Sequence, residues 1–125
     1  MVVLNGSSSA GTSSLAAAFQ AREAARGRAW VITGIDDFLG RLPIEFVGVP
    51  DERGPYCDQG FSMQRDAAAL ISITFGPLGL ALMRGYRRSV AALAAAGLSV
   101  LVDEVVLDEA AWDDWVEALA GVDAS

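Results

Sequence analysis

Two glycines near the N-terminus have the spacing of a phosphate-binding loop. An apolar run at 2–4 precedes Gly6, four small residues and Gly11. In the P-loop pattern G-x-x-x-x-G-K-[ST], backbone amides wrap the phosphates, the lysine reaches the β- and γ-phosphates, and the final hydroxyl binds Mg²⁺. Ser13 stands at the hydroxyl position, whereas Thr12 stands where the lysine belongs. The stretch therefore predicts a phosphate site that lacks one cation.

Acidic residues follow two later apolar runs. Asp36 and Asp37 come after the run at 29–33, and Asp103 comes after the run at 98–102. The carboxyl ends of parallel strands meet at one edge of a sheet, where phosphoryl transfer needs carboxylates for Mg²⁺ and for the attacking hydroxyl. Simpler interpretations stay open for each part: a tight Gly/Ser connection, an aspartate that caps a helix, and an acid that ends a strand.

The composition excludes several functional classes. All nine basic residues are arginines, and the formal net charge is −7, so we expect no nucleic-acid partner. The absence of histidine excludes histidine-based triads, and the single Cys57 excludes an internal disulfide and a cysteine-cluster metal site. No apolar run reaches the length of a membrane helix, and no signal peptide precedes the first strand. We therefore expect a cytoplasmic protein without a membrane partner.

Apolar runs alternate with helix-compatible segments along the chain. We expect strands at 2–5, 29–33, 70–75 and 98–102, and helices at 12–26, 38–42, 78–96 and 108–119. Gly27 and Gly97 are expected to end two of these helices. Residues 43–66 are rich in proline, glycine and acid, and we expect a long loop or a small hairpin region there. The alternation predicts an α/β fold with a parallel sheet and right-handed crossovers.

Two of the expected helices carry groups of side chains with simple structural interpretations. We expect one group to be a solvated face of the long helix: Arg84, Arg87 and Arg88. We expect the other to be the apolar stripe of the last helix, and its tryptophans to belong to the core: Trp112, Trp115, Val116 and Leu119.

Taken together, these stretches resemble the chloramphenicol phosphotransferase family of P-loop kinases. The resemblance spans essentially the whole chain, through the segments VVLNGSSSAGTSS, WVITGIDDFLGRLP and GPLGLALMRGYRRSVAALAAAGLSVLVDEVVLDE. It implies a P-loop NTPase-like three-layer α/β/α fold with a small, mostly parallel sheet. It also implies that 1–125 is a single, incomplete domain that lacks the family's C-terminal strands and lid. Residues 43–75 would form an irregular insertion on the substrate side.

The resemblance also implies an activity and the residues that carry it. The family transfers the γ-phosphoryl group of ATP, with Mg²⁺, to a hydroxyl of a small molecule, which is chloramphenicol in the named case. Asp36 corresponds to the catalytic base, and Ser13 and Asp103 correspond to metal ligands. The nucleotide would be bound by Gly6, Ser7, Ser8, Ser9, Ala10, Gly11, Thr12, Ser13 and Ser14. The acceptor would be bound by Asp37, Phe46, Tyr56, Phe61 and Met63.

This chain departs from the family pattern in two ways. Thr12 replaces the lysine, and no basic residue follows Arg88, so the arginine of the family's lid has no counterpart. A second interpretation is therefore a degenerate or truncated P-loop module that acts by binding a nucleotide or a partner without catalysis. A third is a kinase for a metabolite unrelated to antibiotics. An unfinished sheet edge would also permit self-association.

Overall fold

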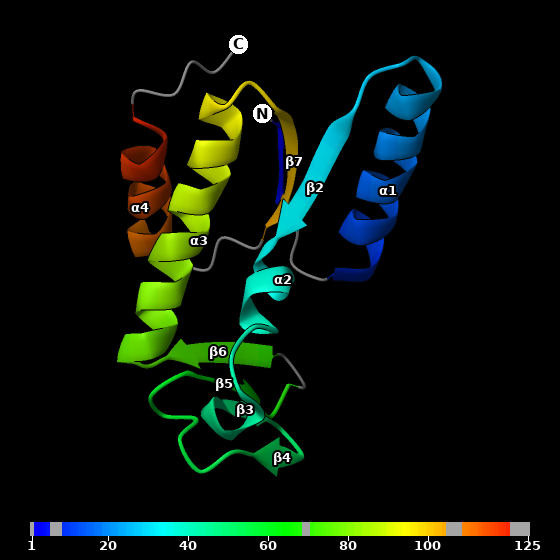
Figure 1. The fold of residues 1–125 in the computed structure, drawn as a ribbon. Helices are drawn as coiled ribbons and strands as arrows, with labels where there is room; N and C mark the ends of the chain where they lie inside the picture. Colours follow the sequence, from blue (N-terminus) through cyan, green and yellow to red (C-terminus); the bar gives the residue numbers. More distant parts are fainter. Residues whose placement is uncertain (1, 6–8, 69–70, 105–108, 121–125) are drawn as a thin grey trace. The chain divides into compact units, whose positions relative to one another are not determined.

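The computed structural model has a mixed α/β fold with four α-helices and two small sheets in the part of the chain that it describes (Figure 1). The described residues are 2–5, 9–68, 71–104 and 109–120, with only the backbone described at 2–5, 9–13, 71 and 104. The elements in chain order are β1 (Val2–Asn5), α1 (Ser9–Ala25), β2 (Trp30–Gly34), α2 (Ile35–Leu39), the 3₁₀ helix η1 (Ile44–Phe46), β3 (Val47–Val49), β4 (Glu52–Arg53), β5 (Phe61–Arg65), β6 (Ile71–Phe75), α3 (Pro77–Ala95), β7 (Ser99–Glu104) and α4 (Glu109–Leu119).

The chain divides into two compact units. The parallel-sheet unit comprises Met1–Ile35 and Gly85–Ser125, and the small-sheet unit comprises Asp36–Arg84. One boundary follows β2, and the other falls within α3. Each unit contains one of the two sheets. None of the described helices is both long and apolar enough to cross a membrane.

Three strands form the sheet of the parallel-sheet unit, in the order β1-β7-β2. Both pairings are parallel, and Val102 of β7 lies opposite Val3 of β1. β7 has a neighbour on each side, and Val100, Leu101 and Val102 are almost completely buried. A parallel strand that is covered on both faces has a continuous apolar sequence, as 100–102 does. The expected parallel sheet is confirmed for these strands.

The helix α1 packs along β2 through its side chains. Ala16 is buried, and the ring of Phe19 meets the ring of Trp30 edge-on with the centroids 5.1 Å apart. Gln20 Nε2 also donates a hydrogen bond of 2.8 Å to the carbonyl oxygen of Trp30. Figure 1 shows the helix lying alongside the strand. An aromatic contact and a partly buried amide hydrogen bond therefore hold the two elements together.

Glycines in the left-handed region end α1 and α3 as the sequence predicts. Gly27 has a φ of 76° and Gly97 a φ of 91°. The amide of Arg28 donates to the carbonyl of Glu23, and the amide of Gly27 donates to the carbonyl of Ala24. These are the paired hydrogen bonds of a Schellman motif, in which a residue without a Cβ adopts a positive φ at no steric cost. Both helix-ending predictions are confirmed.

The helix α4 packs against the C-terminal part of α3 through a narrow contact. Trp115 is buried, and its ring lies 5.5 Å from that of Tyr86, edge-on. The core position predicted for Trp115 is therefore confirmed. The prediction for Trp112 and Val116 is wrong, because they are 56% and 59% exposed. The sequence shows that α4 has an apolar stripe. It does not show that Trp115 alone is buried there while Trp112 and Val116 stay exposed.

The small-sheet unit contains four strands in the order β4-β3-β5-β6. The pair β3–β5 is parallel, whereas the pairs β3–β4 and β5–β6 are antiparallel. Of the two alternatives expected for 43–66, the small hairpin region is confirmed by the antiparallel pair β3–β4, and the structure adds a 3₁₀ helix and β5 in this stretch. β3 and β4 span only three and two residues, which is too short for an alternating pattern to mark them.

Glycines allow very close backbone contacts in this unit. A Cβ atom at Gly60 would overlap the carbonyl oxygen of Phe46, and one at Gly76 would overlap the carbonyl oxygen of Asp58. A Cβ at Gly79, in the first turn of α3, would overlap the carbonyl oxygen of Gly60. Only glycine fits at these positions. The first turn of α3 therefore packs directly against the backbone of Gly60.

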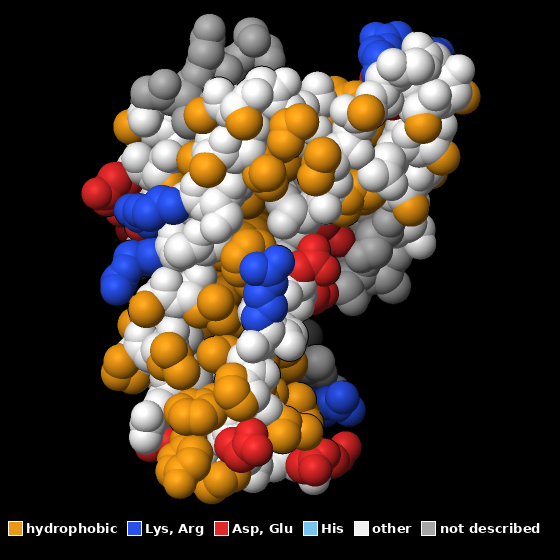
Figure 2. Space-filling view, in the orientation of Figure 1, with side chains coloured by type: hydrophobic (Ala, Val, Ile, Leu, Met, Phe, Trp, Pro, Cys, Tyr) orange, Lys and Arg blue, Asp and Glu red, His pale blue; other side chains and the backbone are white. Residues whose placement is uncertain are grey.

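Apolar side chains lie both inside and on the surface of the small-sheet unit. Cys57 and Phe61 are buried, and the rings of Phe61 and Phe75 lie 6.5 Å apart. Figure 2 shows hydrophobic side chains gathered on the outside of this unit, where Ile44 and Tyr56 are among the exposed apolar residues. The unit therefore carries apolar surface in addition to its buried residues.

Several element boundaries differ from those predicted. α1 begins at Ser9 rather than at residue 12, and α2 begins at Ile35 rather than at residue 38. β7 begins at Ser99 rather than at residue 98, and it ends in the acidic residues Asp103 and Glu104. Small and acidic residues are compatible with a helix or strand end as well as with a loop, so the pattern leaves these limits open. The shift in α2 moves Asp36 and Asp37 from before a helix into its first turn.

Candidate active site at the carboxyl edge of the parallel sheet

The carboxyl ends of the three parallel strands lie at one edge of their sheet. At this edge Asn5 of β1 is opposite Glu104, and Gly34 of β2 is opposite Asp103. Asp103 is also opposite Leu4, so strand pairing fixes its backbone on both sides. Its side chain is half-buried. The prediction that Asp103 lies at the end of this strand is confirmed, because it occupies the strand's second-to-last position.

Gly34 is required by the close approach of β2 to β7. A Cβ atom at this position would lie 2.8 Å from the carbonyl oxygen of Asp103 and 3.4 Å from its Cβ atom. Because β-carbons essentially never come that close to a backbone oxygen, a larger residue would displace Asp103. The sequence shows a glycine before Ile35 and Asp36 but not its purpose, which depends on strand register. Gly34 therefore positions the carboxylate-bearing strand end.

The predicted phosphate loop, Gly6 to Ser14, begins after β1 and extends into the first turns of α1. Gly6, Ser7 and Ser8 lie outside the described residues. Residues 9–13, which include the predicted ligands Thr12 and Ser13, form the start of the helix, and Ser14 is exposed there. A strand followed by the N-terminus of a 17-residue helix is the backbone arrangement in which phosphates are bound by free amides.

The helix α2 begins directly after β2 and carries two carboxylates. Asp36 and Asp37 occupy its first turn, and both are exposed. Their negative charges are favourable there because the N-terminal end of a helix is electropositive. Leu39 of the same helix is buried, which anchors the element. Asp36 and Asp37 belong to the small-sheet unit, whereas Asp103 and the predicted loop belong to the parallel-sheet unit.

A family comparison now adds to this geometry. The model of the family described as chloramphenicol phosphotransferase-like protein matches residues 1–124. The chain belongs to this family. The resemblance inferred from the sequence motifs is thereby confirmed, and it extends over nearly the whole chain.

Two curated relatives come from Mycobacterium tuberculosis. They are named Putative O-phosphotransferase MT2714 (strain CDC 1551 / Oshkosh) and Putative O-phosphotransferase Rv2636 (strain ATCC 25618 / H37Rv). Each is 32% identical to this chain over 106 residues, a match that covers 85% of this chain and 46% of the relative. The chain thus spans about half the length of the curated relatives that it matches.

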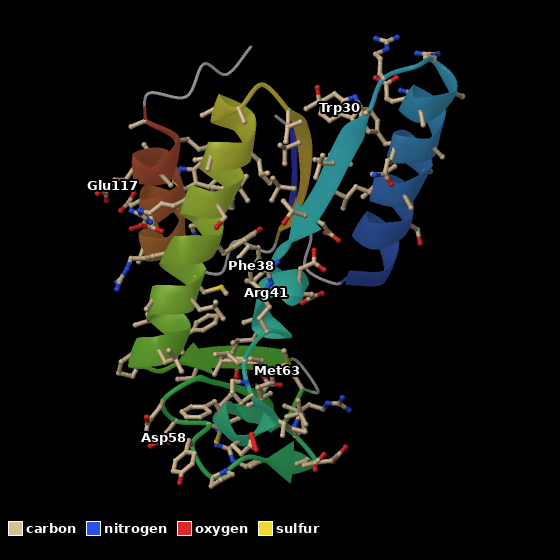
Figure 3. All side chains as sticks on the ribbon, viewed as in Figure 1. Trp30, Phe38, Arg41, Asp58, Met63 and Glu117 are labelled. Atoms are coloured by element: carbon tan, nitrogen blue, oxygen red, sulfur yellow. The ribbon has the colours of Figure 1, made fainter. Side chains whose placement is uncertain are left out.

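The residues predicted to bind the acceptor all belong to the small-sheet unit of this phosphotransferase-like chain. Phe46 and Tyr56 are neighbours, with ring centroids 5.2 Å apart, and Tyr56 is 48% exposed. Met63 is half-buried on β5, where Figure 3 labels it. Phe61 is only 3% exposed, so its ring serves chiefly as core. The structure therefore brings Phe46 and Tyr56 together and leaves Tyr56 the most accessible of the four apolar residues.

The described side chains do not form a metal site by themselves. No group of three or more Cys, Asp or Glu side chains in the described part of the chain could hold a metal ion. The predicted pair Ser13 and Asp103 would supply two oxygen donors. Such a pair suits Mg²⁺, which keeps several waters and binds phosphate oxygens together with one or two protein ligands.

An ion cluster between α3 and α4 was missed by the sequence analysis. Arg87 Nη1 donates to Asp114 Oδ2 at 2.9 Å, and Arg88 donates to both carboxylate oxygens at 3.1–3.2 Å. The Arg87 side chain is 10% exposed, so the expected solvated face is wrong for this residue. Only the packing of the two helices brings Asp114 to these arginines. The cluster is a structural contact of the parallel-sheet unit.

Proposed function

We propose that this chain is an ATP-dependent O-phosphotransferase that moves the γ-phosphoryl group to a hydroxyl of a small molecule, either a chloramphenicol-like antibiotic or a related metabolite. The observation that carries the proposal is the strand edge at which Gly34 and Asp103 lie side by side, next to the end of β1. Family membership and the names of the two relatives support the same activity.

The proposed fold is the three-layer arrangement of a P-loop kinase, with 1–125 as one domain. Figure 1 supports it within the parallel-sheet unit, where α1 lies on one side of the strands and α4 on the other. In this proposal Gly6 to Ser14 wrap the nucleotide phosphates. The stretch 43–75 supplies the acceptor side, with Asp37, Phe46, Tyr56 and Met63 as contacts.

The proposed reaction uses Asp36 as general base. Its carboxylate accepts the proton of the acceptor hydroxyl, and the acceptor oxygen forms a bond to the γ-phosphorus. The bond between that phosphorus and the oxygen bridging the β- and γ-phosphates breaks, and ADP leaves with that oxygen. Asp36 is exposed in the first turn of α2, so an acceptor hydroxyl has access to it. Members of this family generally use ATP with Mg²⁺, which when bound would offset negative charge on the phosphates.

Thr12 weakens the proposed site without removing it. A threonine hydroxyl can donate a hydrogen bond to phosphate but carries no charge. Losing one preorganised electrostatic contact in a transition state typically lowers the rate on the order of 10²–10³-fold. We therefore propose slow turnover that relies on backbone amides and on Mg²⁺ for charge neutralisation.

The decisive test compares binding with turnover. Asp36→Asn should lower phosphoryl transfer by about 10²–10⁴-fold, as expected for loss of a general base, while the affinity for ATP stays unchanged. ADP release and product mass report turnover, and calorimetry reports binding. The matched control is Asp58→Asn, which neutralises an exposed aspartate of the same unit. Failure of the wild-type chain to bind ATP at millimolar concentration would refute the proposal.

The alternative is a degenerate module that binds a nucleotide or a partner without catalysis. The observation that favours it is Thr12, because the lysine position carries no cation. Thr12→Lys distinguishes the two functions. A large gain in ATP affinity without any transfer to an acceptor supports the degenerate module, whereas a gain in both affinity and turnover supports the enzyme.

A further inference from the structure

Arg41 is held against the ring of Phe38 just beyond α2. Its guanidinium carbon lies over the ring at 4.3 Å from the centroid, and Figure 3 labels both residues there. The amide of Arg41 donates a hydrogen bond of 3.1 Å to the carbonyl of Phe38, so the two residues close a turn that follows α2. Residues three apart on a helical turn share one side, which explains the contact. The ring attracts the cation and restricts the guanidinium.

The charge of Arg41 is not neutralised by any carboxylate among the described residues. Four other arginines form ion pairs: Arg26 and Arg28 with Glu23, and Arg87 and Arg88 with Asp114. Asp37 lies four residues before Arg41, a spacing at which helical ion pairs form, yet no ion pair joins them. The exposed guanidinium therefore keeps its charge and N–H donors for another partner.

The chemistry of a stacked guanidinium defines that partner. An arginine whose face lies on an aromatic ring still presents N–H groups along its planar edge, and their spacing matches the two oxygens of a carboxylate. Two negative charges, on Asp36 and Asp37, lie earlier on the same short helix. They would repel an anionic ligand, so a carboxylate would bind beside α2 only with a cation such as Arg41 to receive it.

We propose that Arg41 binds a carboxylate of the acceptor, which narrows the two proposed acceptors to a metabolite that is a hydroxy acid and sets aside a chloramphenicol-like one, which has no carboxylate. The carboxylate accepts two hydrogen bonds from the guanidinium, and Phe38 positions that guanidinium. Arg41 and the proposed base Asp36 belong to the same unit and are five residues apart in the sequence. The word acceptor rests on the proposed function, whereas the carboxylate site itself does not.

The experiment titrates two matched probes into the ¹⁵N-labelled full chain. The probes are 4-(hydroxymethyl)benzoate and 4-(hydroxymethyl)benzamide, which differ only in the charged group. We expect the benzoate to bind about tenfold more tightly, as one charge-assisted contact implies, and to shift the Nε–H signal of Arg41. Arg41→Gln should equalise the two affinities. Phe38→Leu should weaken benzoate binding about two- to fivefold, because the cation loses its aromatic support.

The control is Arg53→Gln, which removes an exposed arginine of the same unit on β4 and should leave the preference for benzoate intact. Backbone amide spectra verify that each variant is folded. Equal affinities in the wild type, no binding of benzoate, or a preference that survives in Arg41→Gln would overturn the inference. These results need no turnover. A chain that binds benzoate through Arg41 but transfers no phosphate would refute the proposed function alone.

Discussion

Two glycines of α3 show how differently the two units are built. Gly79 lies in the small-sheet unit, and a Cβ atom there would overlap the carbonyl oxygen of Gly60. Gly85 lies in the parallel-sheet unit, and a Cβ atom there would meet nothing within 4 Å. The same residue type in the same helix is thus a steric requirement at one position and a conformational weakness at the other.

The difference extends to the sheets. The parallel-sheet unit is held by buried apolar side chains, such as those of Val100 and Val102 on β7. The small-sheet unit depends on backbone segments in direct contact at Gly60, Gly76 and Gly79. Side-chain packing tolerates modest changes of shape, whereas a backbone contact of this kind has no room for a methyl group. The proposed acceptor side is therefore the more fragile of the two regions.

The largest change in stability is expected at the contact between Gly79 and the backbone of Gly60. Gly79→Ala should lower the free energy of unfolding by about 3 kcal/mol, because the new methyl group collides with backbone that cannot move aside. Urea denaturation measures the change, and amide hydrogen exchange should show lost protection in β5 and β6. An unchanged midpoint would mean that the backbone contact contributes little to the stability of the small-sheet unit.

The next prediction concerns the ion cluster of Arg87, Arg88 and Asp114, which joins α3 and α4 in the parallel-sheet unit. Asp114→Asn should lower the free energy of unfolding by about 2 kcal/mol, because the nearly buried guanidinium of Arg87 loses its carboxylate and its Nε has no hydrogen-bond partner among the described residues. Asp113→Asn is the matched control, since Asp113 is exposed, and it should change stability by less than about 0.5 kcal/mol. Equal effects of the two substitutions would contradict this role.

The carboxylate of Asp114 should also make the stability of the protein depend on pH, with a smaller effect. Burial raises the pKa of Asp114, but the hydrogen bonds and charges of Arg88 and Arg87 outweigh it and hold the pKa below its ordinary value. Stability from this group is therefore fully present above the unfolded-state pKa of about 4 and is lost as the pH falls through the lower folded-state value. Thermal unfolding of the wild type and Asp114→Asn should differ most near neutral pH and converge in acid.

The smallest expected effect has the opposite sign. Gly85→Ala should raise the free energy of unfolding by about 0.5–1 kcal/mol, because alanine restricts the unfolded chain and the helix has room for its methyl group. Urea denaturation alongside Gly79→Ala would measure the contrast directly. A destabilised Gly85→Ala variant would show that α3 does not tolerate a methyl group at this position, in contrast to the open space beside Gly85.

Much of the parallel-sheet unit could be predicted because its signals are local. The continuous apolar run of β7 and the glycines that end α1 and α3 each have a direct physical meaning within a few residues. Only part of the small sheet could be predicted: the strand at 70–75 corresponds to β6, whereas β3 and β4 are too short to carry a periodic pattern. Arg87 and Trp112 were misplaced for a related reason: whether a helix side chain is buried depends on a neighbouring helix that its own pattern does not specify.

For the candidate site, too, some features could be read from the sequence and others depended on the tertiary structure. The sequence specified the residue types: a glycine-rich loop with Thr12 in place of lysine, Asp36 after one apolar run and Asp103 in another. Their catalytic roles stay predictions. Only the tertiary structure decided that Gly34 must be glycine, because strand register brings it against Asp103. It likewise decided that Arg41 rests on Phe38 rather than on Asp37. Residue chemistry is local, whereas register and side-chain contacts depend on segments that meet only when the chain folds.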